Sequence, residues 1–235
     1  MITTAVILAA GLGSRLRPYT DHHPKGFIPV NGEPIVVTSI KKLLAVGVTR
    51  IIIGTGYMKT HYEELCKVYT EIECVYNPDY ELTGSMATLA CCQNVIGKND
   101  FLLLESDLVY AQRALEEIVT FAHPTVMLAS GETGSGDEVY IEYDETHILK
   151  NLSKNINKLE HVSAELVGIN KISHDAFQEM VQGFDVSKNP KLDYEGMMAT
   201  MSAQYQNVVV HKIDDLVWCE IDNESHLRRA RILKV

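Results

Sequence analysis

The feature that most constrains this chain is a short apolar run that opens into a glycine-rich loop near the N-terminus. Residues 5–8 read Ala-Val-Ile-Leu, a pattern typical of a buried strand. Residues 9–13 read Ala-Ala-Gly-Leu-Gly and carry almost no side-chain bulk. Glycine lets the backbone approach a ligand closely, and a loop after a strand exposes backbone N–H groups. The sequence therefore predicts a phosphate-binding loop after the first strand.

This loop differs from two common phosphate-binding motifs. No Gly-Lys-Ser/Thr follows it, so it is not a Walker A loop, and Leu16 stands where a dinucleotide fingerprint has its third glycine. Three basic residues follow instead, namely Arg15, Arg17 and Lys25. Fixed cations beside exposed backbone N–H groups suit a polyphosphate ligand.

Strands and helices are predicted to alternate along the first 130 residues. The expected strands are 2–8, 50–54, 71–76, 100–105 and 125–130, and the expected helices are 34–45, 61–68, 85–94 and 111–121. Such alternation predicts an α/β fold with a doubly wound, mostly parallel sheet. Ligands of these sheets bind at the carboxyl ends of the strands. Because Gly11 and Asp107 both follow strand ends, we expect them to share one crevice.

The second half of the chain has a different pattern, with short β-rich segments broken by polar turns. The expected strands are 139–143, 148–152, 166–170, 208–213 and 217–221, and the expected helices are 175–182 and 224–233. We expect a single domain over residues 1–235. Its core would comprise 1–130 and 205–235, with a smaller β-rich region at about 131–204 packed against that core.

Composition and charge exclude several classes of protein. The chain has 235 residues, 46% of them hydrophobic and 22% charged, which is ordinary for a globular protein with a sizeable core. Its net charge of −10 argues against nucleic acid as the main partner, because a duplex binder presents a basic face. The N-terminal apolar run is too short for a signal or membrane span, so no membrane insertion is expected. Five cysteines without a CxxC spacing favour reduced, buried thiols in a cytoplasmic protein.

The glycine loop and the basic residues form one longer pattern. Residues 9–15 read small-small-Gly-x-Gly-x-Arg, and residues 18–25 read Pro-x-Thr-x-x-x-Pro-Lys. This string resembles the signature of the nucleotidyltransferases that activate sugar phosphates and phosphocholine-like compounds. The resemblance implies a Rossmann-like, GT-A-like core whose first loop wraps a nucleoside triphosphate, and a region at 131–204 that serves the acceptor as binding site or lid. It assigns nucleotide binding to Leu8, Ala9, Ala10, Gly11 and Gly13.

The resemblance also implies the chemistry. In nucleotidyl transfer an acceptor oxygen attacks the α-phosphorus and pyrophosphate leaves, so neutralising and aligning two anions is most of the work. Lys25 is expected to be the catalytic cation, although a lysine outside this motif would be read as a surface residue. Arg15 is expected to meet the β- and γ-phosphates. Arg17 is equally consistent with a role in bonding the carbonyls of the loop.

Two aspartates are candidate ligands of Mg²⁺. Asp107 follows a hydrophobic strand and resembles the metal-binding aspartate of the family, although turns also favour an acidic residue here. Asp222 is the second candidate, with a helix N-cap as its alternative role. Magnesium prefers one or two carboxylates together with phosphate oxygens and water. Glu105 and Glu220 each lie two residues earlier, on the same side of a strand, and are reserve ligands.

The segment 82–89, Leu-Thr-Gly-Ser-Met-Ala-Thr-Leu, resembles the family loop that holds the base with a glycine and a small hydroxyl residue. We assign Gly84 and Ser85 to nucleotide binding. Ser85 and Met86 are also assigned to acceptor binding, because N–H groups at a helix N-terminus suit an anion. On propensity alone the same segment is a helix start capped by Thr83 or Ser85.

The choice of acceptor depends on which side chains could hold its nitrogen. The short chain and the closing Glu-Ile-Asp resemble cytidylyltransferases for phosphocholine and 2-aminoethylphosphonate. Choline favours an aromatic cage, but residues 84–88 read Gly-Ser-Met-Ala-Thr and Trp218 is the only tryptophan. A primary ammonium needs oxygen acceptors instead. The candidate acceptor-binding acids are Glu138, Asp193 and Glu195, and the tyrosines that keep a cage open are Tyr80, Tyr140 and Tyr194.

The expected activity is Mg²⁺-dependent transfer of CMP from CTP to 2-aminoethylphosphonate, with phosphocholine as the alternative acceptor. Cytidine comes from the resemblance alone, so uridine stays open. Three further alternatives are a sugar-1-phosphate nucleotidyltransferase, a glycosyltransferase with a metal at Asp107, and a non-catalytic nucleotide-binding relative. The cationic loop speaks against the glycosyltransferase, and the presence of Arg15, Lys25 and Asp107 speaks against the non-catalytic relative. A homodimer, and a further domain after Val235, are also left open.

Overall fold

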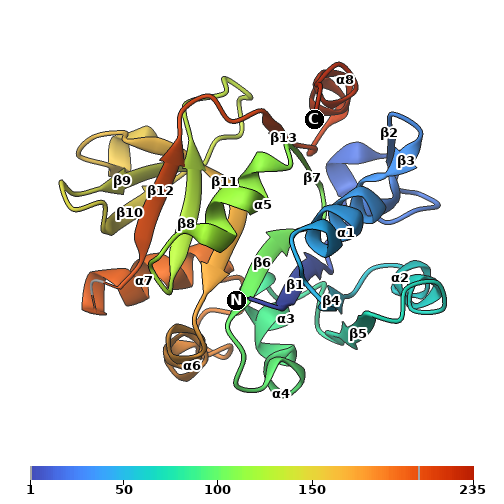
Figure 1. The fold of residues 1–235 in the computed structure, drawn as a ribbon, viewed down its shortest axis with the longest axis horizontal. Helices are drawn as coiled ribbons and strands as arrows, with labels where there is room; N and C mark the ends of the chain where they lie inside the picture. Colours follow the sequence, from blue (N-terminus) through green and yellow to red (C-terminus); the bar gives the residue numbers. More distant parts are fainter. Residues whose placement is uncertain (1, 206) are drawn as a thin grey trace.

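A central β-sheet covered by helices on both faces forms the body of the protein (Figure 1). The computed structural model describes residues 2–205 and 207–235. The main sheet contains β1 (Thr4–Ala9), β4 (Arg50–Thr55), β5 (Ile72–Tyr76), β6 (Phe101–Glu105), β8 (Val126–Ser130), β9 (Tyr140–Tyr143), β10 (Leu149–Ser153), β11 (Ala164–Ile172) and β12 (Val209–Ile213). Figure 1 shows β5 and β10 at opposite ends of this sheet.

The predicted doubly wound, mostly parallel sheet is confirmed for the N-terminal part of the chain. Strands β5, β4, β1 and β6 lie side by side and are parallel. Strand β11 then pairs antiparallel with β6, β8 and β9, so the β-rich second half continues the same sheet. Strand β1 is buried on both faces, because Ile7 packs into one core cluster and Val6 into the cluster on the other face. This burial explains the unbroken apolar run that opens the sequence.

Two short ladders complete the strands. One joins β2 (Pro29–Val30) to β3 (Glu33–Pro34), and the other joins β7 (Leu108–Tyr110) to β13 (Trp218–Glu220). The sequence predicted the strand at β13 but not its partner β7. Strand β7 is only three residues long, too short for a hydrophobic period to be visible.

Helices cover the two faces of the sheet in separate groups. The helices are α1 (Ile35–Ala45), α2 (Thr60–Leu65), α3 (Ser85–Cys91), α4 (Gln93–Ile96), α5 (Arg113–Thr120), α6 (His174–Gly183), α7 (Tyr194–Tyr205) and α8 (Glu224–Ala230). Short 3₁₀ turns are η1 (Ser14–Leu16), η2 (Lys25–Phe27) and η3 (Ile156–Lys158). Side chains of α1, α2 and α5 pack into one core cluster, and those of α3, α4, α6 and α7 pack into the cluster on the opposite face.

Three further details differ from the sequence-based expectations. Helix α7 was not predicted, and the expected helix 85–94 is two helices with a break at Cys92. The thiols are not all buried, because Cys91 is exposed and two others are half-buried. None of the helices in the described ranges has both the length and the apolar character that a membrane crossing requires.

Candidate active site

A cleft of about 460 Å³ opens at the carboxyl ends of β1 and β6. The structure brings most of the predicted site residues to its walls. The lining includes Leu8, Ala9, Ala10, Gly11, Gly13, Arg15, Lys25, Gly84, Ser85, Asp107, Glu138, Tyr194, Glu195 and Asp222. Segments from both halves of the sequence therefore meet in one place.

Contacts within the protein hold the glycine loop at Ala10 and Gly13 and leave Gly11 uncovered. Gly13 has φ +61°, and a Cβ there would lie 2.9 Å from the methyl group of Thr20. The Thr20 hydroxyl donates to the Gly13 carbonyl at 2.8 Å, and the Tyr57 N–H donates to the Ala10 carbonyl at 3.1 Å. Among the described residues nothing lies within 4 Å of the place a Gly11 Cβ would take. The loop can thus present its backbone to a ligand without a side chain in between.

Lys25 lies at the centre of a group of carboxylates. It begins η2, and its Nζ contacts Asp107 and lies 2.6 Å from Asp222 Oδ1 and 3.9 Å from Glu220 Oε1. Burial by itself would lower the pKa of Lys25, but the negative charges of the three acids outweigh it and hold that pKa above its usual value. The lysine is therefore a permanent cation fixed inside the cleft.

The β7–β13 ladder brings Asp107 and Asp222 together from distant parts of the sequence. The ladder pairs Leu108 with Glu220, and the Ile221 N–H donates to the Asp107 carbonyl at 3.1 Å. Burial raises the pKa of Asp222, but Lys25 and Arg15 outweigh this effect and hold the pKa below its usual range. Asp107 Oδ1 and Asp222 Oδ2 are buried and have no hydrogen-bond partner among the described residues.

Two further acids stand next to this pair. Three carboxylate oxygens lie within 4.8 Å of one another, one each from Glu105, Asp107 and Glu220. Burial, and then the charges of neighbouring acids, raise the pKa of Glu105 to about 8 and that of Glu220 to about 10. Four carboxylates thus lie close together, and two of them have a buried oxygen without a partner among the described residues. Such a group of oxygen atoms matches the ligand preference of a hard divalent cation.

Arg15 also contacts Asp222, and it shares its other partner, Asp137, with a second cation. Its guanidinium lies 2.6 Å from Asp137 Oδ2 and 2.7 Å from Asp222 Oδ1. Lys154 Nζ lies 2.8 Å from the other oxygen of Asp137. Sequence reasoning missed Asp137 and Lys154, because they lie in polar loops with no motif around them. No local signal could have found them.

The part of the cleft formed by Glu138 and residues 193–195, called the acceptor end below, carries the predicted acceptor residues. The Tyr194 hydroxyl donates to Glu105 Oε1 at 2.7 Å, and its ring is buried. Burial, followed by the negative charge of Asp193, raises the pKa of Glu195 to about 7. Glu138 lines the cleft too, but its Oε1 accepts the Gly136 N–H at 3.1 Å, so it also holds the turn of its own loop.

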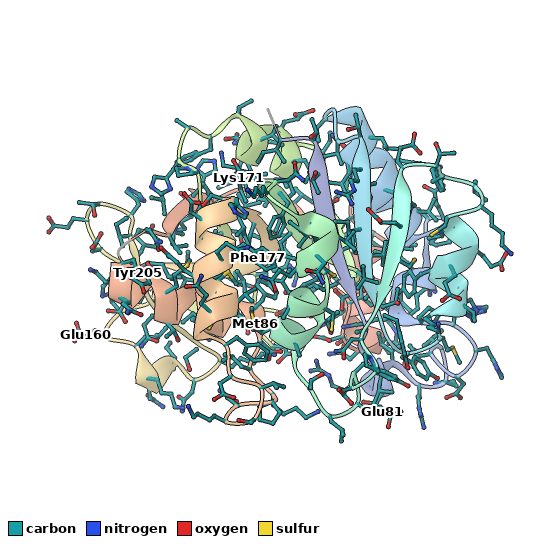
Figure 2. All side chains as sticks on the ribbon, turned by 90° about the horizontal axis from the view of Figure 1, so that it is seen from below. Glu81, Met86, Glu160, Lys171, Phe177 and Tyr205 are labelled. Atoms are coloured by element: carbon teal, nitrogen blue, oxygen red, sulfur yellow. The ribbon has the colours of Figure 1, made fainter. Side chains whose placement is uncertain are left out.

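Met86 does not line the cleft, which corrects its sequence-based assignment to acceptor binding. Its side chain is fully buried in the same core cluster as Phe177; both residues are labelled in Figure 2. Helix α3 begins at Ser85, and one residue later its surface already faces the sheet. The position therefore serves packing and cannot contact an acceptor.

The N–H groups at the start of α3 are not free, which is a second correction to the sequence-based expectations. The N–H groups of Gly84 and Met86 donate to the carbonyls of Pro190 (2.7 Å) and Leu192 (3.2 Å). The Ser85 N–H donates to Asp193 Oδ1 at 3.1 Å. The N-cap position is Gly84, rather than Thr83 or Ser85. These amides are thus already satisfied and do not await an anion.

Two of the three tyrosines considered for an aromatic cage lie at the cleft. Tyr80 and Tyr194 line the cleft, whereas Tyr140 lies outside it. Trp218 also reaches the cleft wall, but its indole N–H donates to Ser130 Oγ at 2.8 Å and the side chain is buried in the core. Acidic groups are more numerous than aromatic faces at this end of the cleft.

Comparison with known proteins places this geometry in a family. The family model described as Nucleotidyl transferase matches residues 4–131. The CTP:phosphoglutamine cytidylyltransferase of Campylobacter jejuni is 24% identical over 247 residues, covering 95% of this chain and 97% of that protein. The 2-aminoethylphosphonate cytidylyltransferase of Lancefieldella rimae is 36% identical over 107 residues, covering 46% of this chain and 44% of that protein.

Two more proteins are similar to this chain, one over a short stretch of sequence and the other over the whole fold. The choline-phosphate cytidylyltransferase of Streptococcus pneumoniae is 42% identical over 76 residues, which is 32% of this chain and 33% of that protein. The structure of the inositol-1-phosphate CTP transferase from T. maritima has a TM-score of 0.83 at 17% identity, and the match covers 100% of this chain and 98% of that one. The cleft, its glycine loop and these matches together show that the chain belongs to the nucleotidyl transferase family and is an enzyme of that type.

Proposed function

We propose that this enzyme transfers CMP from CTP to a small phosphate or phosphonate that carries an amine, and that 2-aminoethylphosphonate is this acceptor. The observation that carries the proposal is the position of Lys25 between Asp107 and Asp222 beside an open glycine loop. CTP as the donor is supported by relatives named as cytidylyltransferases.

The residues of the cleft can carry out this transfer by charge and alignment. Backbone N–H groups of the loop at 9–13 would orient the triphosphate, and Arg15 would neutralise its outer phosphates. An acceptor oxygen then forms a bond to the α-phosphorus while the bond to the bridging oxygen breaks and pyrophosphate leaves. Lys25 stays protonated because its pKa is held above the usual value, so it supplies a fixed positive charge throughout.

Asp107 and Asp222 fit a magnesium ion. Each has a buried oxygen without a partner among the described residues, and oxygen is the ligand that Mg²⁺ prefers. Glu105 and Glu220 stand close enough to assist. Bound there, Mg²⁺ would supply further positive charge to the reacting phosphates.

The acceptor end of the cleft favours an ammonium group. Three acids line it, Glu138, Asp193 and Glu195, and carboxylates are the partners that a primary ammonium needs. Phosphocholine is the second candidate, because Tyr80 and Tyr194 also line the cleft and an aromatic face attracts a quaternary ammonium. We assign this acceptor end to the region 131–204.

The test is pyrophosphate release with Mg²⁺, measured for each of the four ribonucleoside triphosphates with each candidate acceptor. The acceptors are 2-aminoethylphosphonate, phosphocholine, phosphoglutamine and glucose 1-phosphate. We expect the highest kcat/KM with CTP and 2-aminoethylphosphonate. A higher value with phosphocholine would transfer the assignment to the second candidate, and turnover of the sugar phosphate alone would contradict both.

A further inference from the structure

Ser85 and Asp193 cap each other's helices across the cleft wall. Helix α3 begins at Ser85 and helix α7 begins at Tyr194, directly after Asp193. Asp193 Oδ1 accepts both the N–H (3.1 Å) and the hydroxyl (3.0 Å) of Ser85. In return, Ser85 Oγ accepts the Tyr194 N–H at 3.0 Å. Each side chain thus satisfies an N–H group that the other's helix start leaves unpaired.

The backbone contacts around this pair leave no space for a ligand between the two segments. Gly84 and Met86 donate to carbonyls of the segment 190–192, as described above. A Cβ at Gly84 would lie only 2.4 Å from the Leu192 carbonyl oxygen. Glycine is therefore required at 84 by the close approach of residues 190–192. This requirement explains the Gly84-Ser85 pair without a bound base.

The same contact determines where the first turn of α7 lies. Tyr194 reaches Glu105 at 2.7 Å from this turn, and Glu195 lines the cleft from it. A shift of the helix start would move both side chains away from the cleft. The Ser85 hydroxyl uses its only proton on Asp193 and one of its lone pairs on Tyr194, so it has no proton left to donate to a ligand.

We propose that Ser85 is a positioning residue for the acceptor, which acts through Asp193 and the start of α7, and that it does not bind the nucleotide. This inference rests on the proposed function in one respect, since it takes the cleft around Tyr194 and Glu195 as the acceptor end. It predicts that loss of the hydroxyl weakens acceptor binding and leaves CTP binding almost unchanged.

The kinetic test compares Ser85→Ala with Ser85→Thr, which keeps a hydroxyl. We expect Ser85→Ala to raise the KM of the acceptor about fivefold to tenfold, the size of one lost helix cap, and Ser85→Thr to restore most of it. The KM of CTP should change by less than about twofold in both variants, since no contact to the nucleotide is removed. The matched control is Ser187→Ala, because Ser187 also donates its hydroxyl to an aspartate, Asp185, but lies outside the cleft. An equal or larger rise in the KM of CTP would overturn the inference.

A second measurement tests the helix contact without relying on activity. Backbone hydrogen exchange at residues 194–198 should become faster in Ser85→Ala and also in Gly84→Ala, whose new methyl group displaces the Leu192 carbonyl. Gly196→Ala is the control within the same helix, because its Cβ would meet only the end of the Leu192 side chain at 3.2 Å. Unchanged exchange in both variants would refute the reciprocal cap. If the wild type turns over none of the acceptors, the proposed function fails, whereas the exchange result still decides the helix contact.

Discussion

The two ends of the cleft are built in different ways. At the phosphate end, charges of opposite sign meet directly, since Lys25 contacts both Asp107 and Asp222 and Arg15 lies 2.7 Å from Asp222 Oδ1. At the acceptor end, the important contacts are hydrogen bonds between helix starts, above all those of Ser85 with Asp193 and Tyr194. One end is thus organised by electrostatics and the other by backbone placement.

This difference separates the expected consequences of mutation. Removing a fixed charge from the phosphate end changes the stabilisation of charge that develops during transfer, so kcat should fall. Loosening a helix start at the acceptor end moves binding groups and leaves the reacting charges in place, so the KM of the acceptor should rise. Three variants examine the contrast, beginning with the largest expected effect.

Lys25→Ala should cause the largest loss. Because Lys25 is a half-buried cation that we propose lies next to the reacting phosphates, we expect kcat to fall by about 10² to 10³, the size seen when one preorganised charge or donor is lost. Steady-state kinetics with saturating CTP would measure it. Lys67→Ala removes an exposed lysine paired with Glu64 and should have no effect. Near-normal turnover of a folded Lys25→Ala protein would remove this residue from the mechanism.

Asp107→Asn should abolish the response to magnesium together with activity. The substitution keeps the side-chain size but removes the charge from a carboxylate whose Oδ1 has no other partner among the described residues. Wild-type protein with CTP should show a rise in melting temperature on addition of Mg²⁺, and the variant should not. Asp215→Asn is the control at an exposed acid. A variant that keeps both the thermal shift and turnover would contradict the metal assignment.

The smallest expected effect is a pH dependence at the acceptor end. The pKa of Glu195 is raised to about 7 by burial and by the charge of Asp193, so its carboxylate forms as the pH rises through that value. An ammonium binds the charged form, and the KM of an aminated acceptor should therefore be about tenfold higher at pH 6 than at pH 8.

Glu195→Gln isolates this carboxylate from other titrating groups. The variant should show a flatter pH profile, because its side chain cannot gain a charge. Ethylphosphonate, which has no amine, reports the titration of the phosphonate itself and serves as the reference acceptor. An identical pH profile for Glu195→Gln and wild type would show that this carboxylate does not contact the amine.

The fold of the N-terminal half was predictable because its signals are local. The strand and helix periods around Ile7, Ile40 and Leu103 are each contained in one short segment, and all three predicted elements are present. Helix α7 was not predictable in this way. Its buried side chains do recur at helical spacing, from Tyr194 through Met197 and Met198 to Met201, but Ala199 and Ala203 on the other faces are apolar too, so no polar face marks the period. Its first N–H group bonds to Ser85, 109 residues earlier in the chain.

The sequence by itself determined the glycine loop, the basic segment up to Lys25 and the acid after β6, because each depends on a few consecutive residues. Only the tertiary structure decided that Arg15 meets Asp137 and that Asp193 caps α3, contacts that join residues 122 and 108 positions apart. The tertiary structure also decided that the Met86 side chain is buried in the core. The physical reason is that a hydrogen bond or ion pair between distant segments leaves no periodic trace in either segment, and its partners become visible only when the sheet brings them together.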